Sequence, residues 1–122
     1  MIQIRALINS FKYAIKGVSY VFRHEQNFRI QIFASILVIL AMIIFGLRRS
    51  EVIVICLIIF LILILELLNS ALEKFVDIIK PRLHIQAEIV KDIMAAMVFS
   101  ASLGAMIIGS IIFWPYVLNL FY

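Results

Sequence analysis

Three long stretches of this chain contain no charged side chain, and this constrains its fold more than any other feature. They cover residues 30–47, 52–65 and 93–122. Eighteen helical residues rise about 27 Å, close to the roughly 30 Å of a hydrocarbon core. The hydrophobic share of the chain is 66%, against about 45–50% in soluble domains. These features predict an all-α integral membrane protein, because a helix satisfies its own backbone polar groups inside lipid.

Charges and prolines set the limits of the membrane-spanning segments. We predict one domain over residues 1–122, with spans over residues 29–47, 52–79 and 87–114. The second uncharged run has only 14 residues and rises about 21 Å, so the membrane must extend past Glu66. Pro81 ends this helix, because proline lacks the backbone N–H donor. Trp114 and Pro115 mark the predicted exit of the third span.

A different pattern precedes the first span. Residues 2–23 place apolar side chains at helical spacing beside a narrow basic stripe of Arg5, Lys12, Lys16 and Arg23. A basic amphipathic helix of this kind lies in the plane of an anionic membrane surface. The alternative is a helix packed on a soluble core, which the adjacent membrane spans disfavour. We also expect a polar hinge at residues 24–29 and a tight turn at residues 48–51.

The distribution of basic residues predicts the orientation. Nine of the eleven lysines and arginines lie before or at the start of the first span, or around the loop between the second and third spans. The other two, Arg48 and Arg49, lie in the first loop and weigh against the majority. The positive-inside rule therefore places the N-terminus and the second loop in the cytoplasm.

Five of the seven acidic residues fall between the second and third uncharged runs: Glu66, Glu73, Asp77, Glu88 and Asp92. At about 100° per residue, Glu66, Glu73 and Asp77 share one helical face. Asn69 and Ser70 lie on the same side, at the i+3 and i+4 positions from Glu66. Carboxylates at a membrane edge are costly, so they indicate a functional site. Three spans are too few to cover them within one chain, which predicts a homo-oligomer with sites shared between subunits.

These residue types suit phosphoryl transfer, which needs a carboxylate-held metal, a cation for the phosphates and a base near the attacking hydroxyl. Glu25 and Glu73 would share Mg²⁺ near the cytoplasmic interface, and Lys91 would bind phosphate. Glu66 lies deeper and would act as a general base on a lipid hydroxyl. The chain has four glycines, which form neither a P-loop nor a Gly-rich kinase loop, so spacing alone does not establish ATP binding.

Other interpretations of these residues stay open. Glu73 and Asp77 also fit a solvated helix face, and Lys91 fits a lysine that extends its amine to the interface. Asn69 fits a hydrogen bond between helices. A ring of Glu66 side chains would suit a small oligomeric channel or a proton-coupled transporter, although the carboxylates gather at one membrane edge. A structural membrane adaptor would leave Glu66 unexplained.

The acidic block resembles the signature of a known family. The segments from Glu66 to Glu73, Val76-Asp77 and Lys91-Asp92 resemble those of the small prokaryotic diacylglycerol kinases, and residues 10–17 and 27–29 match as well. The N-terminal half is similar to the Gram-positive branch, whose members phosphorylate undecaprenol. The resemblance implies a homotrimer of three-span subunits, each with a surface helix, in the bacterial inner membrane.

The resemblance also implies an activity and residue roles. Members use MgATP to phosphorylate a lipid alcohol, undecaprenol or diacylglycerol, at the cytoplasmic face. Glu66 would be the catalytic base, supported by Asn69, and the Mg²⁺ ligands would be Glu25 and Glu73. The residues expected around the nucleotide and its metal are Tyr13, Glu25, Glu73, Asp77, His84, Lys91 and Asp92. Membrane lipids would surround the trimer, and no nucleic-acid partner is expected.

The basic stripe of the N-terminal helix gives a first prediction. A peptide of residues 1–23 should bind vesicles that contain anionic lipid and become helical on them. Salt should weaken this binding, because the Debye length falls from about 10 Å at 0.1 M to about 3 Å at 1 M ionic strength. Circular dichroism with vesicle titration measures both effects. Equal binding to neutral vesicles, with no salt dependence, would exclude an electrostatic contribution.

Overall fold

The structure is a computed structural model that describes residues 1–79 and 84–122, apart from the side chain of His84. Four helices make up this part of the chain: α1 (Ile4–His24), α2 (Gln26–Phe45), α3 (Arg49–Ile79) and α4 (His84–Phe121). By length and composition, α2, α3 and nearly all of α4 are able to cross a membrane. The predicted all-α architecture, with three apolar spans after an N-terminal helix, is confirmed.

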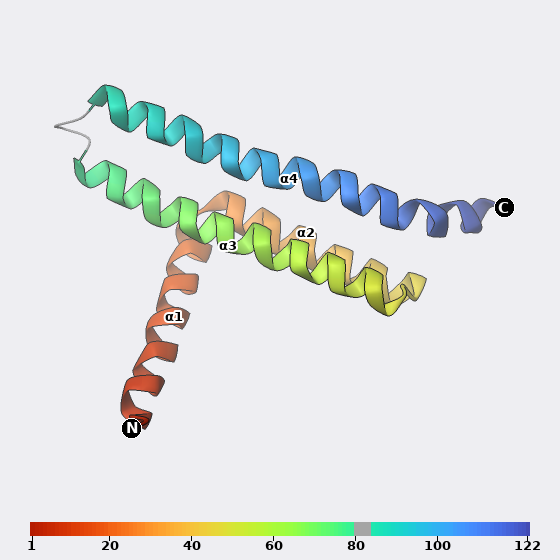
Figure 1. Ribbon diagram of the computed structural model, residues 1–122, viewed down its shortest axis with the longest axis horizontal. Coiled ribbons are helices and arrows are strands. Elements are labelled where there is room, and N and C mark those ends of the chain that lie inside the picture. The colour runs from red at the N-terminus through yellow and green to blue at the C-terminus, as the bar shows by residue number, and fades with distance from the viewer. Residues whose placement is uncertain (80–83) are drawn as a thin grey trace.

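Helix α1 stands apart from the other three helices. Figure 1 shows α2, α3 and α4 side by side along a common axis, whereas α1 lies at a steep angle to them and carries the N-terminus at its free end. Helix α3 packs against both α2 and α4. Apolar side chains of α1 are largely exposed, among them Phe11 at 63% and Ile15 at 65%. This arrangement suits a helix that lies on a membrane surface while its neighbours cross the membrane.

A one-residue elbow joins α1 to α2. Glu25 has an extended backbone, with φ −113° and ψ 111°, and α2 begins directly after it. The predicted hinge over residues 24–29 is therefore too long. Arg29 belongs to α2 and not to a hinge. Its Nη1 atom donates hydrogen bonds of 2.8 and 3.0 Å to two carbonyls in the last turn of α1. These charge-assisted bonds satisfy carbonyls that a helix end leaves open, and they hold the elbow.

Gly46 makes the reversal between α2 and α3. Its φ of 63° and ψ of 52° are left-handed, a conformation that side chains with a Cβ atom disfavour. The N–H groups of Gly46 and Leu47 donate to the carbonyl of Met42 at 3.1 and 3.2 Å, as in a Schellman helix end. The predicted turn at residues 48–51 is wrong in position, because Gly46 has already reversed the chain and α3 begins at Arg49.

Helix α4 is longer than the predicted third span. It passes through Pro115 and ends at Phe121, beyond the expected limit at Trp114. Pro115 removes one helical hydrogen-bond donor from this turn. The next side chain, Tyr116, donates a hydrogen bond to Glu51 at the start of α3. This contact fastens the C-terminal part of α4 to the α2–α3 hairpin.

Two glycine substitutions should have different effects. Gly46→Ala should lower the free energy of unfolding by roughly 1–2 kcal/mol, because alanine would have to adopt the left-handed conformation. Gly104→Ala is the matched control, since a Cβ placed there would meet no described atom within 4 Å apart from its chain neighbours and its own helix backbone, and alanine favours a helix. Thermal unfolding in detergent should show a lower Tm for the first variant and an equal or higher Tm for the second. The reverse order would contradict this account of the turn.

Candidate active site

Polar side chains from three helices and the elbow converge on one cavity of about 490 Å³. The polar residues of its lining are Glu25, Asn27, Gln31, Glu66, Asn69, Glu73, Lys91 and Ser102. Apolar side chains of α4, including Met94 and Phe99, complete the wall. Glu66, Asn69 and Glu73 reach the same cavity because steps of three and four residues keep them on one face of α3. The structure thus brings together five of the residues expected in the site.

Glu66 is the most deeply placed of the carboxylates. Its exposed fraction is 3%, and its Oε1 atom is buried with no hydrogen-bond donor among the residues that the structure describes. A buried carboxylate oxygen without a donor costs free energy, so it marks a place where a ligand or a proton is expected. The expectation that one chain cannot cover these carboxylates is wrong for Glu66. The long helices α2, α3 and α4 contribute enough side chains around it within a single chain.

Glu25 reaches the cavity from the elbow and not from a helix. Its Oε1 atom accepts a long hydrogen bond of 3.4 Å from the Ser70 hydroxyl. Ser70 is itself only 3% exposed and lies one turn after Glu66 on α3. The elbow therefore positions a second carboxylate beside the Glu66 face of α3. The i+4 spacing from Glu66 placed Ser70 on this face, but no role in the site was predicted for it.

Lys91 connects α4 to α3 at the outer end of the cavity. Its Nζ atom lies 2.9 Å from Oδ1 of Asp77, and the two side chains are 33% and 52% exposed. An exposed ion pair of this kind contributes about 0–1 kcal/mol. Lys91 also lines the cavity. Its ammonium group could therefore pair with a bound phosphate at little cost in free energy from the weakened contact with Asp77. Asp77 lies outside the lining and is joined to it through the contact with Lys91.

Not every predicted residue lies at this cavity. Tyr13 is 69% exposed on α1, and Asp92 is exposed on α4; both lie outside the lining. The side chain of His84 is outside the described part of the structure. Three polar residues of the lining, Asn27, Gln31 and Ser102, were not among the predicted site residues. Gln31 and Ser102 interrupt apolar runs of two spans, and this interruption was the available signal.

The donor set fits a divalent cation that arrives with its own oxygen ligands. Within the part of the chain that the structure describes, no three His, Cys, Asp or Glu side chains are grouped closely enough to hold a metal. Mg²⁺ is commonly bound by one or two carboxylates, with water and phosphate oxygens completing its shell. The two half-buried carboxylates, Glu25 and Glu73, meet that requirement in number and chemistry. A metal bound together with phosphate groups is therefore the arrangement that these residues suit.

Carboxylates and a lysine around one cavity are groups that phosphoryl transfer uses, and helices long and apolar enough to cross a membrane form the walls of this cavity. Together they indicate an integral membrane phosphotransferase. Comparison with known proteins gives the family. The model of the family described as prokaryotic diacylglycerol kinase matches residues 12–113. The chain belongs to this family of membrane lipid kinases, as the acidic block indicates.

Individual relatives agree with this assignment. The chain is 42% identical to a diacylglycerol kinase of Synechocystis sp., over 93% of its own length and 66% of the relative's. It is 35% identical to a diacylglycerol kinase of Haemophilus influenzae, over 88% of its own length and 92% of the relative's. It is 33% identical to an undecaprenol kinase of Bacillus subtilis, over 93% and 92% of the two lengths. The chain thus spans about two thirds of the first relative and most of the others. No solved structure gives a significant match.

The burial of Glu66 predicts that this side chain lowers stability. Glu66→Gln keeps the size of the side chain and removes the charge, so it should raise the Tm in detergent without nucleotide. Glu73→Gln is the matched control, because Glu73 is only half-buried on the same face and its Tm should change little. Scanning calorimetry or a dye-based melt measures both variants. A lower Tm for Glu66→Gln would show that the carboxylate makes a net stabilising contact.

Proposed function

We propose that this protein uses MgATP to phosphorylate the hydroxyl of a membrane lipid at the cytoplasmic face of a bacterial inner membrane. One observation carries the proposal: Glu66 is buried without a donor from the described part of the chain, in the same cavity as Glu25, Glu73 and Lys91. Relatives named diacylglycerol kinase and undecaprenol kinase supply the two candidate acceptors.

The spacing along α3 supports a division of roles by depth. Glu66 and Glu73 are seven residues apart, which places Glu66 about 10 Å deeper along the helix. A lipid hydroxyl would approach Glu66 from the membrane, and a nucleotide would approach Glu73 from water. Glu66 would accept the hydroxyl proton as the lipid oxygen attacks the γ-phosphorus of ATP, and the bond from phosphorus to the ADP oxygen would break. Asn69 lies between the two levels and would orient the reacting hydroxyl.

The phosphate groups would bind at the outer end of the cavity. Glu25 and Glu73 would hold Mg²⁺, which neutralises charge on the phosphates when bound. Lys91 would donate to phosphate oxygens while Asp77 holds its side chain in place. Family resemblance adds nucleotide contacts from Tyr13 on α1 and from His84 and Asp92 in the N-terminal part of α4.

A homotrimer would complete the site. Tyr13 and Asp92 lie outside the cavity of their own chain, so a neighbouring subunit would have to supply such contacts. Many large apolar side chains of the three spans are exposed in a single chain, among them Phe60 and Phe99. Subunit contacts would cover some of them, and lipid would cover the others.

The interior beyond the carboxylates favours the kinase over a channel or a proton-coupled transporter. An ion pathway needs polar groups along the span. The adjoining cavity is walled mainly by alanine, valine, isoleucine and other apolar residues. Such a lining suits a hydrocarbon chain better than an ion.

Two variants should separate base catalysis from metal binding. Glu73→Gln should weaken MgATP binding, because a neutral amide is a poor ligand for a hard cation. Glu66→Gln should bind MgATP nearly as well as the wild type and lose about 10²–10⁴-fold in kcat, the usual contribution of a general base. Titration of MgATP binding together with steady-state kinetics on lipid alcohols measures both effects.

Glu88→Gln is the control for these measurements, because Glu88 is an exposed carboxylate of α4 outside the cavity lining. It should leave both binding and turnover near the wild-type values. Near-normal turnover by Glu66→Gln would end the assignment of this residue as the base. Absence of phosphate transfer to any lipid alcohol by the wild type would overturn the kinase proposal itself.

A further inference from the structure

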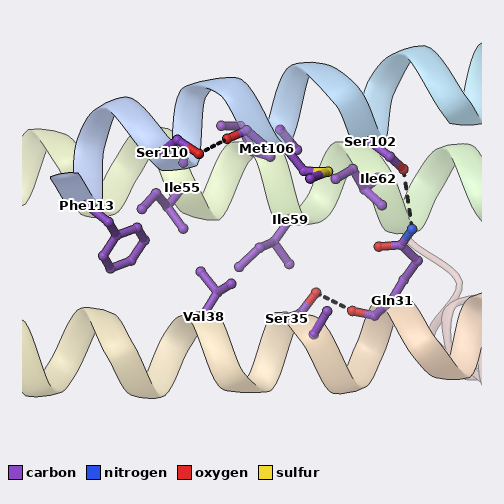
Figure 2. A pocket seen from close by; sticks show the side chains of 14 residues that line it. Gln31, Ser35, Val38, Ile55, Ile59, Ile62, Ser102, Met106, Ser110 and Phe113 are labelled. Carbon is purple, nitrogen blue, oxygen red and sulfur yellow. Dashed lines mark hydrogen bonds between the residues drawn. The ribbon is translucent and has the colours of Figure 1, made fainter. Parts of the chain in front are cut away.

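A second cavity, of about 530 Å³, continues from the candidate active site into the interior of the bundle. It lies between α2, α3 and α4, and most of its wall is apolar. Gln31 and Ser102 line both cavities, so the two spaces adjoin at these side chains. Figure 2 shows Gln31 and Ser102 at one end of the second cavity and Phe113 at the opposite end. The pair therefore stands between the carboxylates and a hydrocarbon-like space.

Four polar side chains of the described residues line this second cavity, and two of them are bonded within their own helices. The Ser35 hydroxyl donates to the Gln31 carbonyl at 2.7 Å, and the Ser110 hydroxyl donates to the Met106 carbonyl at 2.6 Å. The Gln31 side chain instead donates across to Ser102 at 3.4 Å, which is long for a hydrogen bond. An amide has two N–H donors and a hydroxyl has one donor. Gln31 and Ser102 thus keep donor capacity for a ligand.

Helix geometry places Ser102 at the depth of Glu66. The contact between Lys91 and Asp77 fixes the relative register of α4 and α3. Ser102 lies eleven residues along α4 from that contact, and Glu66 lies eleven residues back along α3. Each interval rises about 17 Å, and the two helices run in opposite directions (Figure 1). Gln31 and Ser102 therefore lie beside the place where Glu66 would meet a lipid hydroxyl.

We propose that Gln31 and Ser102 are specificity-determining residues, which donate hydrogen bonds to an ester carbonyl next to the reacting hydroxyl of the lipid. This inference rests on the proposed lipid kinase function. In a diacylglycerol, ester carbonyls lie a few bonds from the free hydroxyl, and the acyl chains match the apolar cavity beyond. A polyprenol offers only carbon and hydrogen at those positions, so the two donors would face hydrocarbon. The pair thus favours a diacylglycerol over a polyprenol.

An ether-linked lipid isolates the interaction, because a dialkylglycerol keeps the hydroxyl and the chains of a diacylglycerol but lacks the carbonyl oxygens. The purified full-length protein is assayed in mixed micelles with MgATP and three acceptors: a diacylglycerol, the dialkylglycerol with matched chains, and undecaprenol. The wild type should show a kcat/KM about three- to tenfold higher for the ester than for the ether, as one or two hydrogen bonds would give.

Substitutions then assign that preference to the pair. Gln31→Met and Ser102→Ala remove the donors separately, and each should bring the ratio of ester to ether kcat/KM toward one. The kcat/KM for the ether lipid and for undecaprenol should change much less. Ser110→Ala is the matched control, because that hydroxyl already bonds within α4, and it should leave the ratio unchanged. A purely structural role of the pair would lower activity on all three lipids alike.

The outcomes distinguish the inference from the function on which it rests. Equal kcat/KM for ester and ether in the wild type, or an unchanged preference in both variants, would overturn the role of Gln31 and Ser102 while lipid kinase activity stands. No phosphorylation of any of the three lipids would instead overturn the proposed function. If one variant fails to fold, the other variant and the wild-type ratio still decide the result.

Discussion

Backbone polar groups inside a bilayer have to be hydrogen-bonded within the protein, and the rest of this structure depends on that requirement. It makes α2, α3 and α4 long continuous helices and confines breaks in the described backbone to the elbow at Glu25 and the reversal at Gly46. It also makes polar side chains costly within the spans. Glu66, Gln31 and Ser102 accordingly line cavities between helices.

The elbow makes the surface helix part of the site. Glu25 is the one residue between α1 and α2, so the direction of α1 affects where its carboxylate lies. Arg29 holds the end of α1 from the first turns of α2. A second contact holds the last turns of α1. Tyr20 stacks on His24 with ring centroids 4.1 Å apart, and Nζ of Lys74 on α3 lies 5.3 Å from the centre of the Tyr20 ring. A cation at that distance is attracted to the ring face, which links α1 to α3.

Polarity falls steadily with depth along the bundle. The exposed ion pair of Lys91 and Asp77 lies outermost, followed by the half-buried Glu73 and then by the buried Glu66. Beside Glu66, Gln31 and Ser102 line the boundary between this polar cavity and the apolar cavity that lies deeper. Such a gradient matches a reaction that joins a charged, water-borne substrate to an apolar, membrane-borne one. The two substrates would meet near Glu66, where charged side chains give way to apolar ones.

The sequence by itself determined three apolar spans, an amphipathic first helix and a shared face for Glu66, Asn69 and Glu73, because hydropathy and helical periodicity are local properties of the chain. Its acidic block also indicated the family. Only the tertiary structure decided that one chain buries Glu66, that Glu25 contacts Ser70, and that Gln31 bonds to Ser102. These contacts join residues 45 and 71 positions apart. They depend on how each helix is rotated and shifted against its neighbours, which the periodicity of a single helix does not specify.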